Sequence, residues 1–372
     1  MSLPLLYQFV DWCKTKIISP QTQDKELPVA DRLRNLPSEF TLRDLVGITE
    51  RAFELKTSPY QKNADDAARQ WFRSFNVYDG ANLSKFLDLG KFDLFAALSF
   101  PNASQSHLET CLIFFLWAFS TDDLSDEGEL QSKPEDVQAS VDVSMEILHD
   151  PQAPVPDQPY AAMLHSILSR MRTTATPGTV ARFSRAFEHW SQSQILQSRN
   201  RSIKRMPSVE EFIVMRRATI GGAMVEAMVE YSLDLQLPDY VFIDPIVVAM
   251  SEATTDIMTW PNDLCSFNKE QADGDFQNLV FVLMVERDLD LQGAVDTLTQ
   301  MLSDRVDEYV ELKKQLPSFG TEVDAELGKH HKNLEHFVQG TVLWYYLSPR
   351  YFRTLDVAER ENLIIPIFPR EL

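Results

Sequence analysis

Glycine, cysteine and long apolar runs are all scarce in this chain of 372 residues. Only 12 glycines occur, against about 26 expected at the usual ~7% of residues, and glycine supplies the tight turns that multi-stranded folds need. The three cysteines are odd in number, far apart and without CxxC spacing, which argues against a disulfide framework or a zinc site. The longest apolar run, Leu112–Phe119, is far shorter than the ~20 residues that cross a bilayer. We therefore expect an all-α fold with no membrane span.

Positive charge is also in short supply, because 35 basic residues stand against 55 acidic ones and the formal net charge is −20. A surface this acidic repels phosphate backbones and anionic membranes, so nucleic acid is not expected as a partner. The N-terminal stretch MSLPLLYQFVDWCKTK lacks a basic leader and a small-residue cleavage site. With reduced thiols as the default for these cysteines, the features together predict a cytoplasmic protein.

Short clusters of proline and polar residues divide the chain, and helical periodicity fills the stretches between them. Apolar residues recur at intervals of three and four, as in Phe183, Phe187 and Trp190, which is the spacing of one helix face. At roughly 11–20 residues for a helix and its connection, we expect about ten to twelve helices. The expected breaks are Ser19–Lys25, Ser58–Lys62, Phe100–His107, Asp150–Pro159 and Leu316–Thr321.

The first chemical signal lies at Trp117–Glu129, WAFSTDDLSDEGE, where an apolar run ends in five acidic residues and no basic one. Residues at i and i+4 share a helix face, so Asp122 and Asp126 can point into the same space. Like charges placed this way raise one another's pKa unless a cation intervenes, and hard oxygen ligands suit Mg²⁺. The alternative is a helix end with a solvated acidic face.

The second signal lies at Trp260–Glu270, WPNDLCSFNKE, which places Asn262, Ser266 and Glu270 at i, i+4 and i+8. Successive steps of four rotate by only about 40° on a helix with 3.6 residues per turn, so an amide oxygen, a hydroxyl and a carboxylate line one face. Such a row offers a second site for a hard cation. The alternative is an ordinary polar helix face, but the full pattern should occur by chance on the order of once in 10⁵ starting positions.

Both motifs resemble those of class I terpene synthases, and in particular those of fungal (basidiomycete-type) sesquiterpene synthases. The family's aspartate-rich motif is similar to residues 122–126, DDLSD, and its Asn/Ser/Glu metal triad is similar to the second row. The stretch GDFQNLV after the triad resembles the family's usual continuation, and WYYLSPRYF at 344–352 resembles its C-terminal Arg-Tyr motif. The resemblance runs in the family's order from about Ser58 to Phe352, which is most of the chain.

The resemblance implies a single-domain, class I terpenoid synthase-like helical bundle around a central active-site cavity. In that family a trinuclear Mg²⁺ cluster, with Mn²⁺ able to substitute, binds an isoprenyl diphosphate and promotes departure of diphosphate, which leaves an allylic carbocation. The implied metal ligands are Asp122, Asp126, Asn262, Ser266 and Glu270. The implied diphosphate-binding residues are Arg216, Lys269, Arg350 and Tyr351.

The choice between Arg216 and its neighbour Arg217 stays open at this point. By its distance along the chain from Asn262, the family's diphosphate-sensing arginine matches Arg216. Neighbours on a helix point about 100° apart, so the two cannot share a face. Gly221 and Gly222 follow, and this pair would break or kink the helix beside the substrate; the alternative is close helix packing.

A carbocation must be kept from water and from nucleophiles, which calls for an apolar cavity with aromatic faces. Phe115 and Phe119 lie one turn apart and ahead of the aspartates, where they could line such a wall. Simple core packing explains each aromatic residue at least as well. The candidates for the cavity contour are Phe95, Phe115, Phe119, Gly221 and Trp344.

Residues 1–57 precede the part of the chain that resembles the family. We expect them to form a helical N-terminal extension packed on the bundle, with residues 58–372 as the synthase domain. The role of the extension stays open. A monomer or a homodimer fits the resemblance.

The most specific interpretation is a Mg²⁺-dependent class I sesquiterpene synthase. Such a carbon–oxygen lyase ionises farnesyl diphosphate and cyclises the carbocation to a hydrocarbon or alcohol. An isoprenyl diphosphate synthase would carry a second Asp-Asp-x-x-Asp where this chain has NDLCS at 262–266, and use of geranyl or geranylgeranyl diphosphate is a further alternative. A non-catalytic helical scaffold would explain composition and periodicity but not the ordered motifs.

Overall fold

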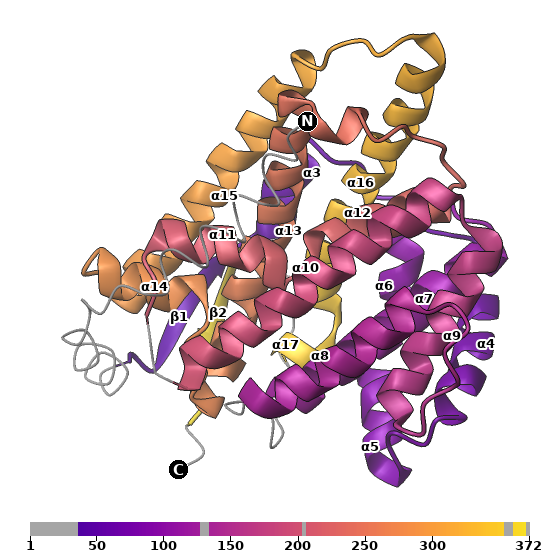
Figure 1. Ribbon diagram of the computed structural model, residues 1–372. Coiled ribbons are helices and arrows are strands. Elements are labelled where there is room, and N and C mark those ends of the chain that lie inside the picture. The colour runs from indigo at the N-terminus through magenta and orange to yellow at the C-terminus, as the bar shows by residue number, and fades with distance from the viewer. Residues whose placement is uncertain (1–35, 127–133, 203–205, 353–359, 370–372) are drawn as a thin grey trace. The chain divides into compact units, whose positions relative to one another are not determined.

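Helices make up nearly all of the regular structure in the described part of the chain (Figure 1). The computed structural model describes residues 36–126, 134–202, 206–352 and 360–369, and from Pro37 onward these belong to one compact unit. The α-helices are α3 (Leu45–Glu50), α4 (Gln61–Arg73), α5 (Gly80–Ser84), α6 (Phe92–Ser99), α7 (Gln105–Asp126), α8 (Pro134–His149), α9 (Pro159–Thr174), α10 (Pro177–Ser202), α11 (Val209–Thr219), α12 (Gly222–Ser232), α13 (Pro245–Asp273), α14 (Leu279–Glu286), α15 (Leu291–Lys314), α16 (Thr321–Leu347) and α17 (Pro349–Phe352). A π-helical turn, η1 (Lys85–Leu89), and a 3₁₀ turn, η2 (Val241–Ile243), join them. The expected all-α class is confirmed, and none of the helices described is long and apolar enough to cross a membrane.

The breaks between helices fall where proline and polar residues predict them. Asp150–Pro159 separates α8 from α9, and Leu316–Thr321 separates α15 from α16. Helix α11 begins with a capping box, in which the Ser208 hydroxyl accepts from the Glu211 N–H and the Glu211 carboxylate accepts from the Ser208 N–H. The break expected at Ser19–Lys25 lies outside the described residues. Within the described part there are fifteen α-helices, more than the expected ten to twelve, and five of them have eight or fewer residues.

A two-stranded antiparallel sheet joins the two ends of the described chain, and nothing in the sequence predicted it. β1 (Glu39–Arg43) pairs with β2 (Asn362–Pro366) over all five residues of each. Phe40 and Leu42 are buried, as the twofold period of a strand with one covered face requires. The Phe40 ring packs edge-on against Phe267 of α13, with centroids 5.9 Å apart. The sheet therefore contacts α13 through this ring pair, and β1 also packs against α15.

Residues 37–57 belong to the same compact unit as the helices that follow. Helix α3 packs against α15 and α16, and β1 packs against α15. The Asp44 side chain caps α3 by accepting from the Val46 N–H. Residues 1–35 lie outside the description, so the expected extension at 1–57 and synthase domain at 58–372 stay predictions.

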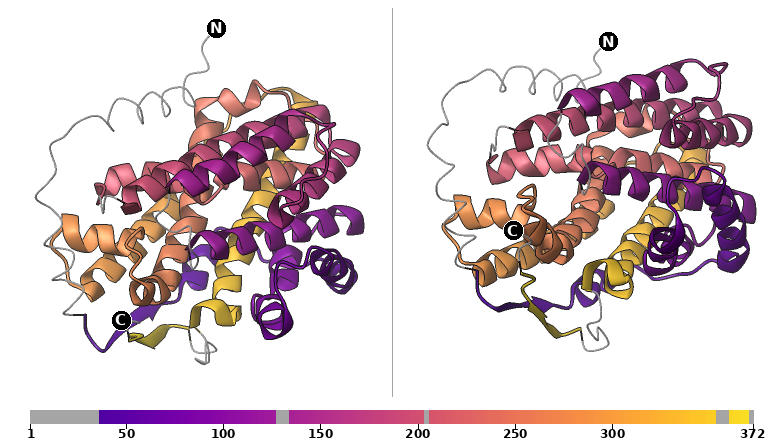
Figure 2. Two further views of the ribbon diagram at one scale, coloured as in Figure 1. Left: turned by 60° about the horizontal axis from the view of Figure 1, so that its bottom comes forward. Right: turned by 90° about the horizontal axis from the view of Figure 1, so that it is seen from below.

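Helix α13 is the central element of the unit. It packs against α11, α12, α14, α15, α16 and α17 (Figure 1), and most of its side chains are buried. On another side of the unit α8, α9 and α10 pack on one another, which the two views in Figure 2 also show. Gly274 ends α13 in the left-handed conformation, with φ of 77°, which glycine adopts without strain.

Helices α6 and α16 approach each other closely at Gly340. A Cβ atom there would lie 2.8 Å from the backbone of Leu98, so the approach requires glycine. The rings of Phe95 and Trp344 stack near this contact with centroids 4.3 Å apart. The Trp344 indole N–H donates to the Gly90 carbonyl at 2.9 Å, which fixes the orientation of the ring.

Candidate active site

One cavity collects nearly all the candidate residues. Side chains from α6, α7, α10, α11, α12, α13, α16 and α17 line it. The predicted site residues on its wall are Asp122, Asn262, Ser266, Glu270, Arg216, Lys269, Arg350, Tyr351, Phe95, Phe115, Phe119, Gly221 and Trp344. The side chain of Asp126, at the end of α7, lies outside the described part of the structure. Residues separated by more than 200 positions thus meet in one space.

The wall of this cavity changes from apolar to polar along each of several helices. Along α7 the lining residues pass from Phe115 to Asp122, a rise of about 10 Å at 1.5 Å per residue. Along α13 they pass from Met258 to Glu270, and α10 changes in the same way before it ends near Arg201. The cavity therefore has an aromatic end and a polar end.

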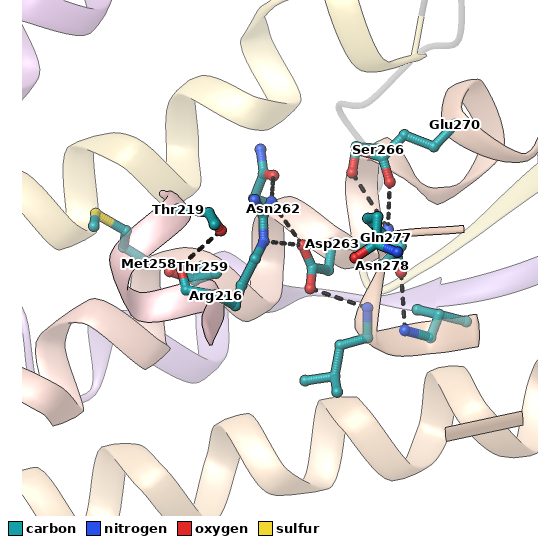
Figure 3. Close-up of polar contacts among 12 residues, drawn as sticks. Arg216, Thr219, Met258, Thr259, Asn262, Asp263, Ser266, Glu270, Gln277 and Asn278 are labelled. Carbon is teal, nitrogen blue, oxygen red and sulfur yellow. Dashed lines mark hydrogen bonds and ion pairs between the residues drawn. The ribbon is translucent and has the colours of Figure 1, made fainter. Parts of the chain in front are cut away.

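The polar ends of four helices are joined by hydrogen bonds. The Arg350 guanidinium on α17 donates to both carboxylate oxygens of Asp123 on α7. The Asn262 amide on α13 donates to the Tyr351 hydroxyl at 3.2 Å. Arg216 on α11 donates to the Asn262 amide oxygen at 2.8 Å (Figure 3). The candidate metal and diphosphate residues thus form one connected group.

The oxygen row on α13 is held by the residue that caps the next helix. The Asn278 side-chain N–H₂ donates to Glu270 at 2.8 Å, to the Asp263 carbonyl at 2.7 Å and, at the limit of hydrogen bonding, to the Ser266 hydroxyl at 3.5 Å (Figure 3). Burial raises the pKa of Glu270 to about 8, and the neighbouring carboxylates of Asp275 and Asp263 add to the rise. A cation placed among these oxygens would lower that pKa again.

Two other acids beside this row are neutralised by arginine. Asp263 is fully buried, accepts from Arg216 Nε at 3.0 Å and accepts from the Leu279 N–H at 3.1 Å. Asp275 accepts from Arg201 at 2.6 and 3.3 Å. A buried carboxylate needs such a partner. These acids therefore position the arginines rather than offer free ligands.

Asp122 and Glu270 are different, because they remain available to a cation. Asp122 is 57% exposed, and Arg350 lies 4.0 Å from it while binding Asp123. Among the described residues, no basic side chain forms an ion pair with Glu270, and its hydrogen bond comes from an amide. The two carboxylates face the same cavity from α7 and α13.

The neighbours Arg216 and Arg217 point to different places. Arg216 lines the cavity and Arg217 does not. Arg217 donates to both oxygens of Asp256 at 2.8 and 2.7 Å and pairs with Glu252 at 2.7 Å. Arg305 shares the same Asp256 carboxylate at 2.9 Å. The structure thus places Arg216 at the candidate site and Arg217 in an ion-pair cluster around the buried Asp256 of α13, outside the lining of the cavity.

The glycine pair breaks the helix, as the sequence predicts. Helix α11 ends at Thr219, Gly221 has φ of 80°, and α12 begins at Gly222. Gly221 lines the cavity at this break. The alternative of close packing also holds for the second glycine, because a Cβ on Gly222 would lie 2.5 Å from the Thr255 hydroxyl.

The aromatic end is formed by stacked rings. Phe95 stacks on Phe115 with centroids 4.2 Å apart and on Trp344 at 4.3 Å. Phe119 meets Trp344 at 5.3 Å and carries the Arg350 guanidinium above its face at 5.4 Å. Phe95, Phe115 and Trp344 are buried in the core and also line the cavity, and the half-buried Phe119 lines it as well. Core packing and a role in the cavity wall are therefore compatible.

The donor atoms at the polar end suit a hard divalent cation. They are carboxylate, amide and hydroxyl oxygens, the ligands that Mg²⁺ and similar ions take. Within the described ranges no group of three His, Cys, Asp or Glu side chains is placed to hold a metal ion. The α13 row contributes one carboxylate beside two neutral oxygens. Such an open set leaves coordination positions for the oxygens of a ligand.

Several residues of the polar end were not singled out from the sequence. Asp123 and Asp263 lie inside the two motifs, and their position there was the signal that could have pointed to their ion pairs with arginine. Arg201, Asp275 and Gln277 also line the cavity. Arg201 stands among polar residues with no pattern to mark it, and only the fold brings it to the site.

Comparison with known proteins identifies the family. Residues 114–308, just over half of the chain, match the family model described as terpene synthase family 2, C-terminal metal binding. The matched segment includes both oxygen-bearing helix ends, on α7 and α13. The chain belongs to the terpene synthase family.

Relatives of this terpene synthase are fungal sesquiterpene synthases. A sesquiterpene synthase from Cyclocybe aegerita is 29% identical over 338 residues, which cover 91% of this chain and 95% of the relative. Alpha-muurolene synthase from Coprinopsis cinerea is 30% identical over 326 residues, which cover 85% of this chain and 75% of the relative. Among solved structures, germacradien-4-ol synthase from Streptomyces citricolor has a TM-score of 0.69 at 20% identity, covering 79% of this chain and 96% of that one. This last likeness shows the fold.

Proposed function

We propose that this terpene synthase is a Mg²⁺-dependent sesquiterpene synthase that ionises farnesyl diphosphate and cyclises the resulting carbocation. The observation that carries the proposal is that one cavity has both a polar end and an aromatic end. A diphosphate ester has the same two parts, a highly charged head and an apolar chain. The similarity to fungal sesquiterpene synthases supports the preference for a sesquiterpene product.

At the polar end, Asp122, Asn262, Ser266 and Glu270 would hold the metal ions, with Asp126 as a further candidate ligand. Bound Mg²⁺ would act as a Lewis acid on the departing diphosphate, and a trinuclear cluster in which Mn²⁺ can substitute remains the expectation. A chain of net charge −20 needs such cations to bind an anionic substrate.

Four donors at the same end would bind the diphosphate. Arg216 and Arg350 carry guanidinium groups fixed by Asp263 and Asp123, so they reach the substrate already oriented. Lys269 and Tyr351 line the same part of the wall. Donors fixed in this way stabilise the leaving group most as its charge develops, which lowers the barrier to ionisation.

At the aromatic end, stacked rings would exclude water and offer their faces to the cation. Phe95, Phe115 and Trp344 are each at most 4% exposed. Together with Phe119 and the backbone at Gly221, the edges and faces of these rings would set the contour in which the isoprenoid chain of the substrate folds. That contour decides which carbon the cation attacks.

The test is incubation of the purified protein with geranyl, farnesyl and geranylgeranyl diphosphates separately, with and without Mg²⁺. Gas chromatography and mass spectrometry of the extract should show a Mg²⁺-dependent C15 hydrocarbon or alcohol from farnesyl diphosphate. A product of another chain length would correct the substrate. Lengthened diphosphates in a parallel assay with isopentenyl diphosphate would indicate chain elongation instead. No product from folded protein would contradict the proposal.

A further inference from the structure

Gln277 stands in the loop that folds back along the metal-facing row of α13. Its backbone N–H donates to Asp275 at 3.0 Å, and its side chain is 7% exposed and lines the central cavity. The next residue, Asn278, is the one that donates to Glu270 and Ser266. Gln277 therefore lies directly beside the candidate metal ligands (Figure 3).

The side-chain oxygen of Gln277 is buried and has no hydrogen-bond partner among the described residues. Buried polar atoms in native proteins nearly always have a partner, and an exception calls for an unseen water, ion or ligand. Other unpartnered buried atoms are scattered through the described fold, and Gln277 is the one of them that lines the cavity. An amide oxygen is an acceptor only, so its partner must be a donor or a cation.

We infer that the Gln277 amide oxygen is a further ligand of the divalent cation on α13, bound directly or through one of the cation's waters. This inference rests on the proposed function, because it assumes that Asn262, Ser266 and Glu270 hold that cation. Mg²⁺ takes six oxygens and keeps several waters, so the row on α13 leaves positions to fill. A further oxygen from Gln277 would fill one of these positions and strengthen the site.

The chain offers a matched control for this residue. Gln339 on α16 is 1% exposed and also has an unpartnered buried side-chain oxygen in the described structure, but it does not line the cavity. Methionine has nearly the length and shape of glutamine without its amide oxygen. Gln277→Met and Gln339→Met therefore remove the same group from two buried places, one at the site and one away from it.

The measurement is a calorimetric titration of the full chain with Mg²⁺ in the presence of inorganic diphosphate, with thermal unfolding as a second readout. Gln277→Met should raise the Mg²⁺ dissociation constant by at least about tenfold and reduce the Mg²⁺-dependent rise in Tm. Gln277→Glu, which keeps an oxygen at that place, should bind Mg²⁺ within about threefold of the wild type or tighter. Gln339→Met should bind it like the wild type.

Three outcomes would overturn the inference. One is wild-type Mg²⁺ binding in Gln277→Met with native circular dichroism, and another is an equal loss in Gln339→Met. If Gln277→Met does not fold, loss of binding in the folded Gln277→Glu variant contradicts the inference in its place. These results leave the proposed function standing. No Mg²⁺ response in the wild-type protein would instead remove the proposed function and this inference together.

Discussion

The two oxygen-bearing helices of the cavity differ in how firmly their candidate ligands are held. On α13, Ser266 and Glu270 receive hydrogen bonds from the buried Asn278. On α7, Asp122 is 57% exposed and its neighbour Asp123 is occupied by Arg350. The α13 half of the site is therefore held by a buried amide as well as by Arg216, a candidate diphosphate donor that binds Asn262, while the described contact on the α7 half comes from another such donor, Arg350. Substrate binding should therefore rearrange the side chains on α7 more than those on α13.

The largest expected effect comes from removing one ligand from each helix. Asn262→Ala and Asp122→Ala should each lower kcat/KM for farnesyl diphosphate by about 10³-fold or more, because the cation and the leaving group lose their support. Far-ultraviolet circular dichroism should stay helical in both variants. Steady-state kinetics with product detection measures the loss, and unchanged activity in both variants would refute the metal assignment.

The same substitution at two adjacent arginines separates catalysis from stability. Arg216→Lys keeps the charge but loses the two-pronged contact to Asp263 and Asn262, so kcat should fall by about 10²-fold. Arg217→Lys should leave kcat within about threefold and lower the free energy of unfolding by about 1–3 kcal/mol, because Asp256 loses part of its partner set. Urea unfolding and kinetics on both variants check this, and equal kinetic losses would contradict the placement of the two side chains.

Removing the residues that hold the ligands tests the difference between the helices directly. Asn278→Ala should raise the Mg²⁺ concentration for half-maximal activity by about 10–100-fold, since supporting residues around metal ligands have effects of this size. Asp123→Asn should instead mainly raise the KM for substrate, because the Arg350 guanidinium loses the carboxylate that orients it. The account predicts two distinct kinetic signatures. Identical changes in the Mg²⁺ requirement of both variants would show that the candidate ligands on α7 and α13 are held equally firmly.

The smallest effect is on pH dependence. In the metal-free protein the pKa of Glu270 is raised to about 8 and that of Glu226, away from the cavity, to about 7, both mainly by burial. At pH values between the ordinary pKa of 4.5 and the raised pKa, each carboxyl group keeps its proton in the folded protein but has lost it in the unfolded chain. The free energy of unfolding therefore falls as the pH rises through this range. Binding of Mg²⁺ and diphosphate should remove the contribution of Glu270 to this pH dependence and leave that of Glu226 unchanged. Chemical unfolding from pH 5 to 9 measures it, with Glu270→Gln and Glu226→Gln as a matched pair.

The sequence predicts the parts of the site that depend on local geometry. A spacing of four residues places Asn262, Ser266 and Glu270 on one face wherever α13 is regular, and a glycine pair breaks a helix in most contexts. The meeting of Arg350 with Asp123 is different, because 227 residues separate them and no local pattern fixes that distance. The resemblance to a family placed Arg350 and the aspartate-rich motif at one site, but it did not predict their contact.

The same limit explains what the sequence did not predict. The pairing of β1 with β2 joins strands from opposite ends of the described chain, and no local pattern in either strand specifies a partner so far away in the sequence. Arg201 reaches the cavity because α10 happens to end beside Asp275. Which arginine of the adjacent pair faces the site follows from the rotation of α11 about its axis, which the sequence left open between Arg216 and Arg217.

The most direct test of the account is to locate the metal. Crystals grown with Mn²⁺ and inorganic diphosphate would show each manganese ion by its anomalous scattering. We expect one ion bound by Asn262, Ser266 and Glu270, and manganese bound by Asp122 on α7 with the diphosphate between the two helices. Manganese bound only at surface acids, with the α13 row empty beside bound diphosphate, would contradict the central claim that these two helices hold the metal.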